Sequence, residues 1–202
     1  MEGHPEHVLG NGVHASQAGF SSSDLYELEA DHFAAALLMP RQPFKKALNR
    51  YEPGLDVVLQ MATLCKTSLT ATAIRYAELT EDAVAVIVST ESTVDYCFLS
   101  DTMKSFLKLE LMWPKKGTPV PKSTETARFN AEPERVSQNE RSDAEVDLMD
   151  WLGGRKSVMV AEEVIGLGGY GKTLTILSSE QLGQGNDNDE EELVENWKPR
   201  FH

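Results

Sequence analysis

A chain of 202 residues is long enough for one domain or two small ones, and its 41% hydrophobic and 25% charged residues are ordinary for a globular protein. The net charge of −13 argues against direct binding to nucleic acid, which requires a basic face. No apolar run has the length of a membrane span, and the acidic N-terminus lacks the hydrophobic centre of a signal peptide. Cys65 and Cys97 lie in apolar runs and are expected to be buried thiols, so we expect a cytoplasmic protein.

The first predicted helix carries two carboxylates on its apolar side. Residues 1 to about 20 are rich in glycine, histidine and serine and are expected to form a loop. Asp24 and Glu27 then have the spacing of a capping box, and Pro40 ends the helix. Glu27 and Asp31 lie four residues apart along it. A carboxylate that faces a core is costly unless it is paired or bound to a metal. By this argument alone, a position at the rim of the core or a pair with an arginine is the favoured interpretation of Glu27, and metal binding is the alternative.

The pattern Glu-x-x-Ala-Asp-x-Phe-Ala-Ala-x-Leu-Leu-Met-Pro at residues 27–40 resembles the signature of the ImmA/IrrE metallopeptidase family. Residues 12–20 also resemble the segment that, in family members, joins a His-Glu-x-x-His helix to this one. The resemblance implies a zinc-dependent endopeptidase that cleaves a regulatory partner, often a helix-turn-helix repressor. It also implies that Glu27 is the third zinc ligand and that Asp31 orients a ligating histidine.

The 202 residues contain no His-Glu-x-x-His motif, which in the family supplies two zinc ligands and the general base. We expect these groups upstream of Met1, in which case this chain is N-terminally truncated and inactive by itself. A non-catalytic binding or regulatory remnant of the family is the alternative. His4 and His7 have helical spacing, but Pro5 favours a loop there, so neither is a predicted ligand.

Loss of the upstream segment would also uncover the apolar side of the Glu27 helix. The residues concerned are Tyr26, Phe33, Leu37 and Leu38. A large exposed apolar patch favours association. We therefore expect the chain to be poorly stable or to self-associate through this helix.

Three more helices are predicted from apolar spacing, over residues 42–50, 56–66 and 68–78. The last two have the length of a helix-turn-helix, but residues 68–78 offer only Arg75 for reading bases. Docking on DNA requires several contacts to phosphate. We therefore expect this pair to pack into the core, and a DNA-binding regulator is the weaker alternative.

From residue 83 the chain becomes rich in β-branched residues, which favours strands. A hairpin is predicted from residues 83–89 and 94–100, followed by a possible strand at 108–113, a loop over 115–134, a short acidic helix over 143–151, and strands at 157–165 and 173–178.

The predicted fold class is α+β. A helical, by resemblance zincin-like, partial metallopeptidase domain (1–80) precedes a β-rich region (81–180) and an acidic, disordered tail (181–202). The alternative for the tail is a docking segment that ends in Trp197 and Phe201.

Residues 166–173 fit the phosphate-loop pattern G-x-x-x-x-G-K-[ST] letter for letter. That pattern cradles phosphate when a helix follows it directly. The residues that follow, Leu-Thr-Ile-Leu at 174–177, are those of a strand. A glycine-rich turn between two strands is therefore predicted, and nucleotide binding is not.

Overall fold

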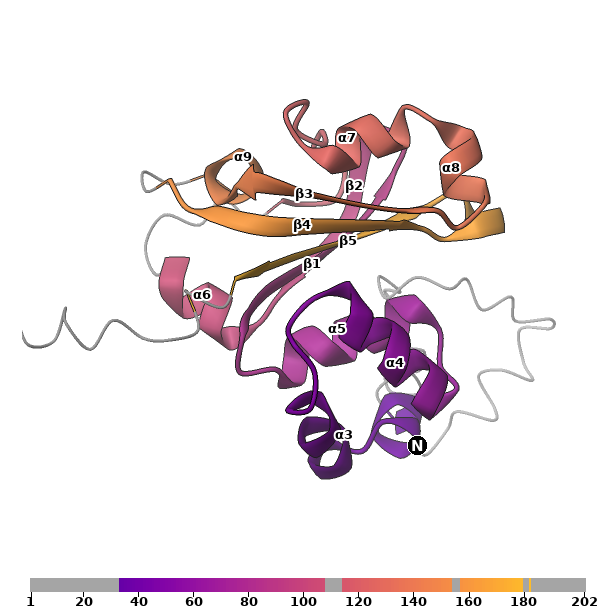
Figure 1. Ribbon diagram of the computed structural model, residues 1–202, viewed down its shortest axis with the longest axis vertical. Coiled ribbons are helices and arrows are strands. Elements are labelled where there is room, and N and C mark those ends of the chain that lie inside the picture. The colour runs from indigo at the N-terminus through magenta and orange to yellow at the C-terminus, as the bar shows by residue number, and fades with distance from the viewer. Residues whose placement is uncertain (1–32, 108–113, 154–156, 180–181, 183–202) are drawn as a thin grey trace, which may run out of the picture.

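The computed structural model describes residues 33–107, 114–153, 157–179 and 182. A five-stranded sheet lies at its centre (Figure 1). On one face lie the helices α3 (Arg41–Leu48), α4 (Leu55–Cys65) and α5 (Leu69–Leu79). On the opposite face lie α7 (Glu125–Asn130), α8 (Pro133–Ser137) and α9 (Leu148–Leu152), and α6 (Asp101–Leu107) packs beside the first strand. The α+β class predicted from the sequence, with helices first and strands after them, is confirmed.

The sheet consists of β1 (Ala83–Thr90), β2 (Thr93–Leu99), β3 (Arg141–Asp147), β4 (Met159–Gly166) and β5 (Thr173–Ser179). Its strand order is β2-β1-β5-β4-β3, and every neighbouring pair is antiparallel. β2 and β3 are therefore the two edge strands. The predicted hairpin is formed by β1 and β2, which pair from Ala85 with Leu99 to Thr90 with Thr93.

α4 and α5 form the bent pair that resembles a helix-turn-helix. α4 ends at Lys66, which has a left-handed φ of 55°, and α5 begins at Ser68, whose Oγ accepts a hydrogen bond of 3.2 Å from the amide of Ala71. Both helices bury most of their apolar residues in the core against the sheet, although Leu64 is 66% exposed, so the expected packing into the core is confirmed. No single described helix is long and apolar enough to cross a membrane, although α4 and α5, bent by 113°, pass that test of length and composition as a pair.

Apolar cores lie on both faces of the sheet. β1 contributes to both, because successive side chains of a strand point to opposite faces. Val84, Val86 and Val88 pack with α3, α4 and α5, whereas Ala85 and Ile87 pack with α6 and α9. The helical half and the sheet thus share the core on the face where α3, α4 and α5 lie. The division of the chain into separate domains near residue 80 stays a prediction.

Two of the predicted elements are wrong. The expected loop over residues 115–134 contains α7, which begins at Thr124, whose Oγ1 accepts a hydrogen bond from the amide of Ala127, and the start of α8. The expected acidic helix over 143–151 is mostly strand β3, and only α9 after it is helical. Pairing with β4 outweighs the weak strand preference of the acidic residues in β3. The possible strand at 108–113 and, apart from Leu182, the acidic tail lie outside the described residues.

Candidate functional site

The predicted metal ligand Glu27 and its supporting residue Asp31 lie outside the described residues. So do all five histidines of the chain, which are His4, His7, His14, His32 and His202. Within the described part of the chain, no three His, Cys, Asp or Glu side chains lie close enough together to hold a metal ion. The structure therefore leaves the roles assigned to Glu27 and Asp31 as predictions.

The C-terminal part of the Glu27 helix is described and is helical over residues 33–38. The chain turns at Met39, which is 2% exposed, and α3 follows Pro40, so the predicted end of the helix is confirmed. Three large apolar side chains remain uncovered, with exposed fractions of 55% for Phe33, 69% for Leu37 and 52% for Leu38. The exposed apolar side expected for this helix is thus present at these three residues.

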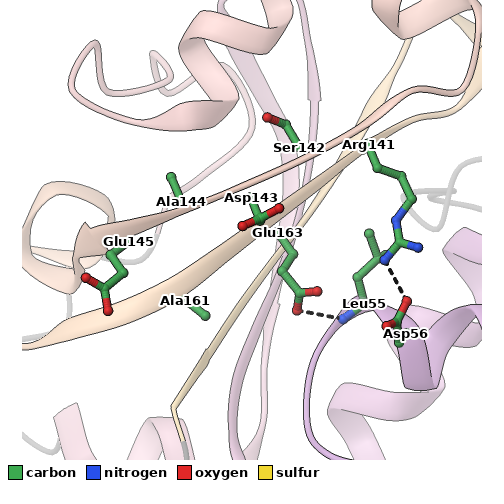
Figure 2. Close-up of a pocket in the computed structure, with 9 residues that line it drawn as sticks. All are labelled: Leu55, Asp56, Arg141, Ser142, Asp143, Ala144, Glu145, Ala161 and Glu163. Carbon is green, nitrogen blue, oxygen red and sulfur yellow. Dashed lines mark hydrogen bonds and ion pairs between the residues drawn. The ribbon is translucent and has the colours of Figure 1, made fainter.

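An open pocket of about 710 Å³ lies where the N-terminus of α4 meets β3 and β4 (Figure 2). The pocket brings together segments that are far apart in the chain. Arg141 Nη2 lies 2.6 Å from Asp56 Oδ1, and these two residues are 85 positions apart. Four of the side chains at the pocket are acidic and one is basic. We call this pocket the acidic groove, and it is lined by Leu55, Asp56, Arg141, Ser142, Asp143, Ala144, Glu145, Ala161 and Glu163.

The alternation of β3 places its charged side chains on the face of the sheet that α4 also occupies. Figure 2 shows Glu145 on this side of the strand and Ser142 and Ala144 on the other. Asp143 and Glu145 are exposed. Their partners in the neighbouring strand β4 are Glu163 and Ala161, respectively. The groove therefore has a small apolar residue, Ala161, between acidic side chains.

Glu163 joins the groove to the helical half. Its Oε2 accepts a hydrogen bond of 2.8 Å from the amide of Leu55, the first residue of α4. Burial raises the pKa of Glu163, and the negative charges of Asp56 and Asp143 act in the same direction, against the Leu55 hydrogen bond and the Arg141 charge. The carboxylate at this position is thus held close to other acids without an ion pair of its own to a described residue.

Gly54 allows this close approach. Its φ of 140° and ψ of −161° lie in a region that only glycine readily adopts. A Cβ atom at this position would lie 2.2 Å from Glu163 Oε2. The backbone amide of Gly54 also donates a hydrogen bond of 3.2 Å to the hydroxyl of the buried Tyr76.

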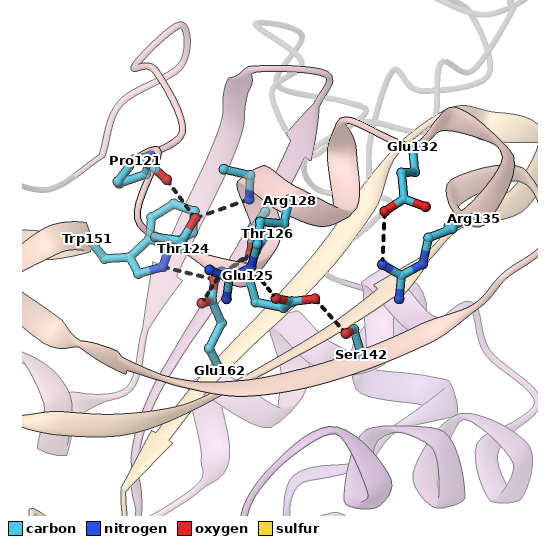
Figure 3. Close-up of polar contacts among 11 residues, drawn as sticks. Pro121, Thr124, Glu125, Thr126, Arg128, Glu132, Arg135, Ser142, Trp151 and Glu162 are labelled. Atoms are coloured by element: carbon cyan, nitrogen blue, oxygen red, sulfur yellow. Dashed lines mark hydrogen bonds and ion pairs between the residues drawn. The ribbon is translucent and has the colours of Figure 1, made fainter.

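The neighbouring residue Glu162 points to the other face of the sheet and is fully buried (Figure 3). Its Oε1 accepts hydrogen bonds from the amide and hydroxyl of Thr126, at 3.1 and 2.7 Å, and from Trp151 Nε1 at 3.2 Å. Its Oε2 accepts one from the amide of Glu125 at 2.7 Å. With four donors around it, this carboxylate is saturated and ties α7 and α9 to β4. We therefore assign it a structural role.

Glu125 in turn connects α7 to β3. Its carboxylate accepts a hydrogen bond of 2.6 Å from the Ser142 hydroxyl and one of 2.7 Å from Arg128 Nε (Figure 3). Burial acts to raise the pKa of Glu125, but these hydrogen bonds and the charges of Arg128 and Arg135 outweigh it, so the pKa is lowered. These contacts hold α7 over the face of β3 opposite the acidic groove.

The glycine-rich segment at 166–173 connects β4 to β5 through a short 3-10 turn at Gly168–Tyr170. The strand predicted to follow it is β5. The side chain of Lys172, which would contact phosphate in a phosphate loop, lies 2.5 Å from Asp95 Oδ2. The helix that a phosphate loop requires is not the element that follows, and the lysine is engaged in an ion pair.

The acidic groove was not predicted from the sequence, because its residues come from α4, β3 and β4. A partial signal was available. Arg141, Asp143 and Glu145 recur at every second position, which is the period of a strand with one charged face. Asp143 and Glu145 also fit the N-terminal turn of an acidic helix, which is the element predicted for residues 143–151.

Comparison with known proteins bears on the helical half of the chain. No curated protein was found to match the chain. The model of the IrrE N-terminal-like domain, Peptidase_M78, matches residues 4–76. The match covers Glu27, Asp31, α3, α4 and α5 as far as Tyr76, and it ends before the sheet. This part of the chain is therefore similar to the IrrE N-terminal-like domain of the M78 metallopeptidases.

Proposed function

We propose that this chain is part of a zinc-dependent metallo-endopeptidase of the ImmA/IrrE type. The observation that carries the proposal is the match of residues 4–76 to the IrrE N-terminal-like domain, because that stretch contains Glu27 and Asp31. Glu27 would bind zinc as its third protein ligand. Asp31 would accept a hydrogen bond from a ligating histidine and so fix its orientation.

The described residues do not fit a zinc ion by themselves, since they include no histidine and no cluster of three possible ligands. The 202 residues contain no His-Glu-x-x-His motif either. We propose that sequence preceding Met1 supplies the two histidines and the general base. When bound, zinc would polarise the scissile carbonyl and activate a water. On this proposal a protein made of these 202 residues alone hydrolyses no peptide.

The proposed substrate is a regulatory protein in the cytoplasm, such as a helix-turn-helix repressor. Two features are consistent with this setting. Within the described residues neither cysteine forms a disulfide, as is usual in a reducing compartment. Cys97 is buried, with a thiol pKa that burial raises to about 12, whereas Cys65 is half-buried and not buried as predicted. The charge of −13 disfavours DNA as the ligand and favours a basic protein partner.

The experiment that tests the proposal starts from the protein isolated from its own host, with its N-terminus determined by mass spectrometry. Zinc content and hydrolysis of candidate repressors are then measured for this protein, for Glu27→Gln and for Glu29→Gln. Glu29 lies two residues away at the opposite edge of the same predicted apolar side, so it is a matched control. Loss of zinc and activity in Glu27→Gln alone supports the assignment. Equal zinc content in all three proteins refutes it.

The alternative function is that of a binding or regulatory protein without catalysis. The acidic groove favours it, because most of its lining residues belong to β3 and β4, outside residues 4–76, and offer a surface for a partner. A chain that neither binds zinc nor cleaves peptides, but captures a defined protein partner through this half, would establish the alternative.

A further inference from the structure

Among the described residues, β3 is uncovered both along its outer edge and on the sheet face that carries Asp143 and Glu145. In the described part of the chain β3 pairs with β4 alone, so the backbone groups on its outer edge have no partner strand. The helices α3, α4 and α5 pack against one face of the sheet, over β1 and β5. On the same face, Asp143 and Glu145 of β3 remain exposed. An edge strand with a free row of amides and carbonyls is a template for a further strand.

The charges beside this edge are mostly negative and largely uncompensated. Asp143 and Glu145 form no hydrogen bond or ion pair with another described residue. Among the residues that the structure describes, the Leu55 amide is the only hydrogen-bond donor to Glu163, and the one basic residue of the groove, Arg141, forms an ion pair with Asp56. The surface therefore attracts positive charge.

We propose that β3 and the acidic groove bind an extended, lysine- and arginine-rich segment of a partner protein. The segment adds a sixth strand to the sheet through main-chain hydrogen bonds with β3. Its alternate side chains face the groove, where ammonium or guanidinium groups lie opposite Asp143 and Glu145 as cross-strand pairs. The small side chain of Ala161 leaves room for the aliphatic stems.

Charge decides between this occupant and a second copy of the chain. Two β3 edges that paired with each other would bring Asp143 and Glu145 of both copies together, and like charges across a strand pair are unfavourable. Such charges protect natural edge strands from pairing at random. A basic strand is the partner that they attract rather than repel. The proposal does not depend on peptidase activity.

The test uses the 202-residue chain and a fluorescent peptide of about ten residues in which lysine alternates with threonine. Binding is followed by fluorescence anisotropy at about 50 mM and about 300 mM salt. The peptide is expected to bind more weakly at the higher salt. Asp143→Lys/Glu145→Lys is expected to weaken binding by roughly tenfold or more. Glu91→Lys/Glu134→Lys makes the same charge change at exposed sites away from the groove and is expected to bind nearly as the natural chain does.

A second probe separates strand addition from simple charge attraction. The same peptide with alternate amides methylated keeps its charge but loses donors to β3, and we expect its binding to be lost. Three results would each overturn the proposal: no binding by the natural chain, equal weakening in both charge-reversed variants, or unchanged binding of the methylated peptide. Asp143→Asn/Glu145→Gln replaces the reversed variant if that variant does not melt like the natural chain. These readouts are independent of zinc content, so failure here is distinguishable from failure of the peptidase assignment.

Discussion

Glu162→Ala is expected to lower the free energy of unfolding by about 3–5 kcal/mol. The carboxylate is 0% exposed and accepts four hydrogen bonds. Its removal leaves the amides of Glu125 and Thr126, the Thr126 hydroxyl and the Trp151 ring nitrogen without this acceptor. A buried donor without a partner costs about 1–3 kcal/mol, and water entering the cavity offsets part of the sum.

Glu162→Gln is expected to cost less, about 1–2 kcal/mol. The amide oxygen can take the place of Oε1 and keep its three donors. The NH₂ group then replaces Oε2 and faces the amide of Glu125, which loses its acceptor. The order of stability should therefore be natural chain, Gln variant, Ala variant.

The assay is urea unfolding followed by tryptophan fluorescence, because Trp151 is part of the network, with circular dichroism as a second probe. Glu145→Ala, at an exposed glutamate of β3, is the control and should change stability by less than about 0.5 kcal/mol. A Glu162→Ala variant within about 1 kcal/mol of the natural chain would refute the reasoning. It would mean that α7 and α9 are held by their apolar contacts and not by this carboxylate.

Three further predictions concern the groove and the exposed helix. Because burial raises the pKa of Glu163, the ionised carboxylate lowers the free energy of unfolding at neutral pH. The free energy of unfolding is recovered as the carboxylate becomes protonated, when pH falls toward the ordinary glutamate pKa of 4.5. Urea unfolding at several pH values should show the natural chain gaining stability relative to Glu163→Gln on acidification, and a constant difference would contradict this. Gly54→Ala should lower the free energy of unfolding by more than about 1 kcal/mol in the same assay, because the new Cβ would lie 2.2 Å from Glu163 Oε2 at a φ that alanine avoids. Adding Glu163→Ala should recover only the part of this loss that comes from the clash, not the part that comes from the backbone conformation. Sedimentation velocity should show the natural chain associating and the triple variant Phe33→Ser/Leu37→Ser/Leu38→Ser remaining monomeric, whereas a monomeric natural chain would rule out the exposed helix as an interface.

The sequence predicts those elements of the fold whose apolar pattern has a single period. β1 is a β-branched run buried on both faces, and α4 and α5 bury apolar residues at helical spacing, so their bounds agree with the prediction within one or two residues. β3 escapes prediction because its sequence Arg-Ser-Asp-Ala-Glu-Val-Asp has few residues that favour strands. Its structure depends on β4, a partner more than ten residues away along the chain.

The candidate sites divide in the same way. Glu27 and Asp31 are predicted from a local pattern within a few residues, and the domain match covers that pattern. The acidic groove depends on a contact between Asp56 and Arg141, and no local period encodes such a contact. The sequence likewise gives no indication that Glu162 is fully buried, since a glutamate is almost always found near the surface.

The two consecutive glutamates of β4 explain how the helices on both faces of the sheet are positioned. Glu162 accepts from the first two amides of α7, and Glu163 accepts from the first amide of α4. Because neighbouring side chains of a strand point to opposite faces, one dipeptide holds a helix N-terminus on each side, where the helix dipole favours negative charge. A shift of β4 by one residue would exchange the two carboxylates, placing the saturated one at the open groove and the other in the core. The pair therefore fixes the register of β4 as well as the two helices. It follows that substitution of Glu162 should act chiefly on stability, whereas substitution of Glu163 should act on pH dependence and on the groove.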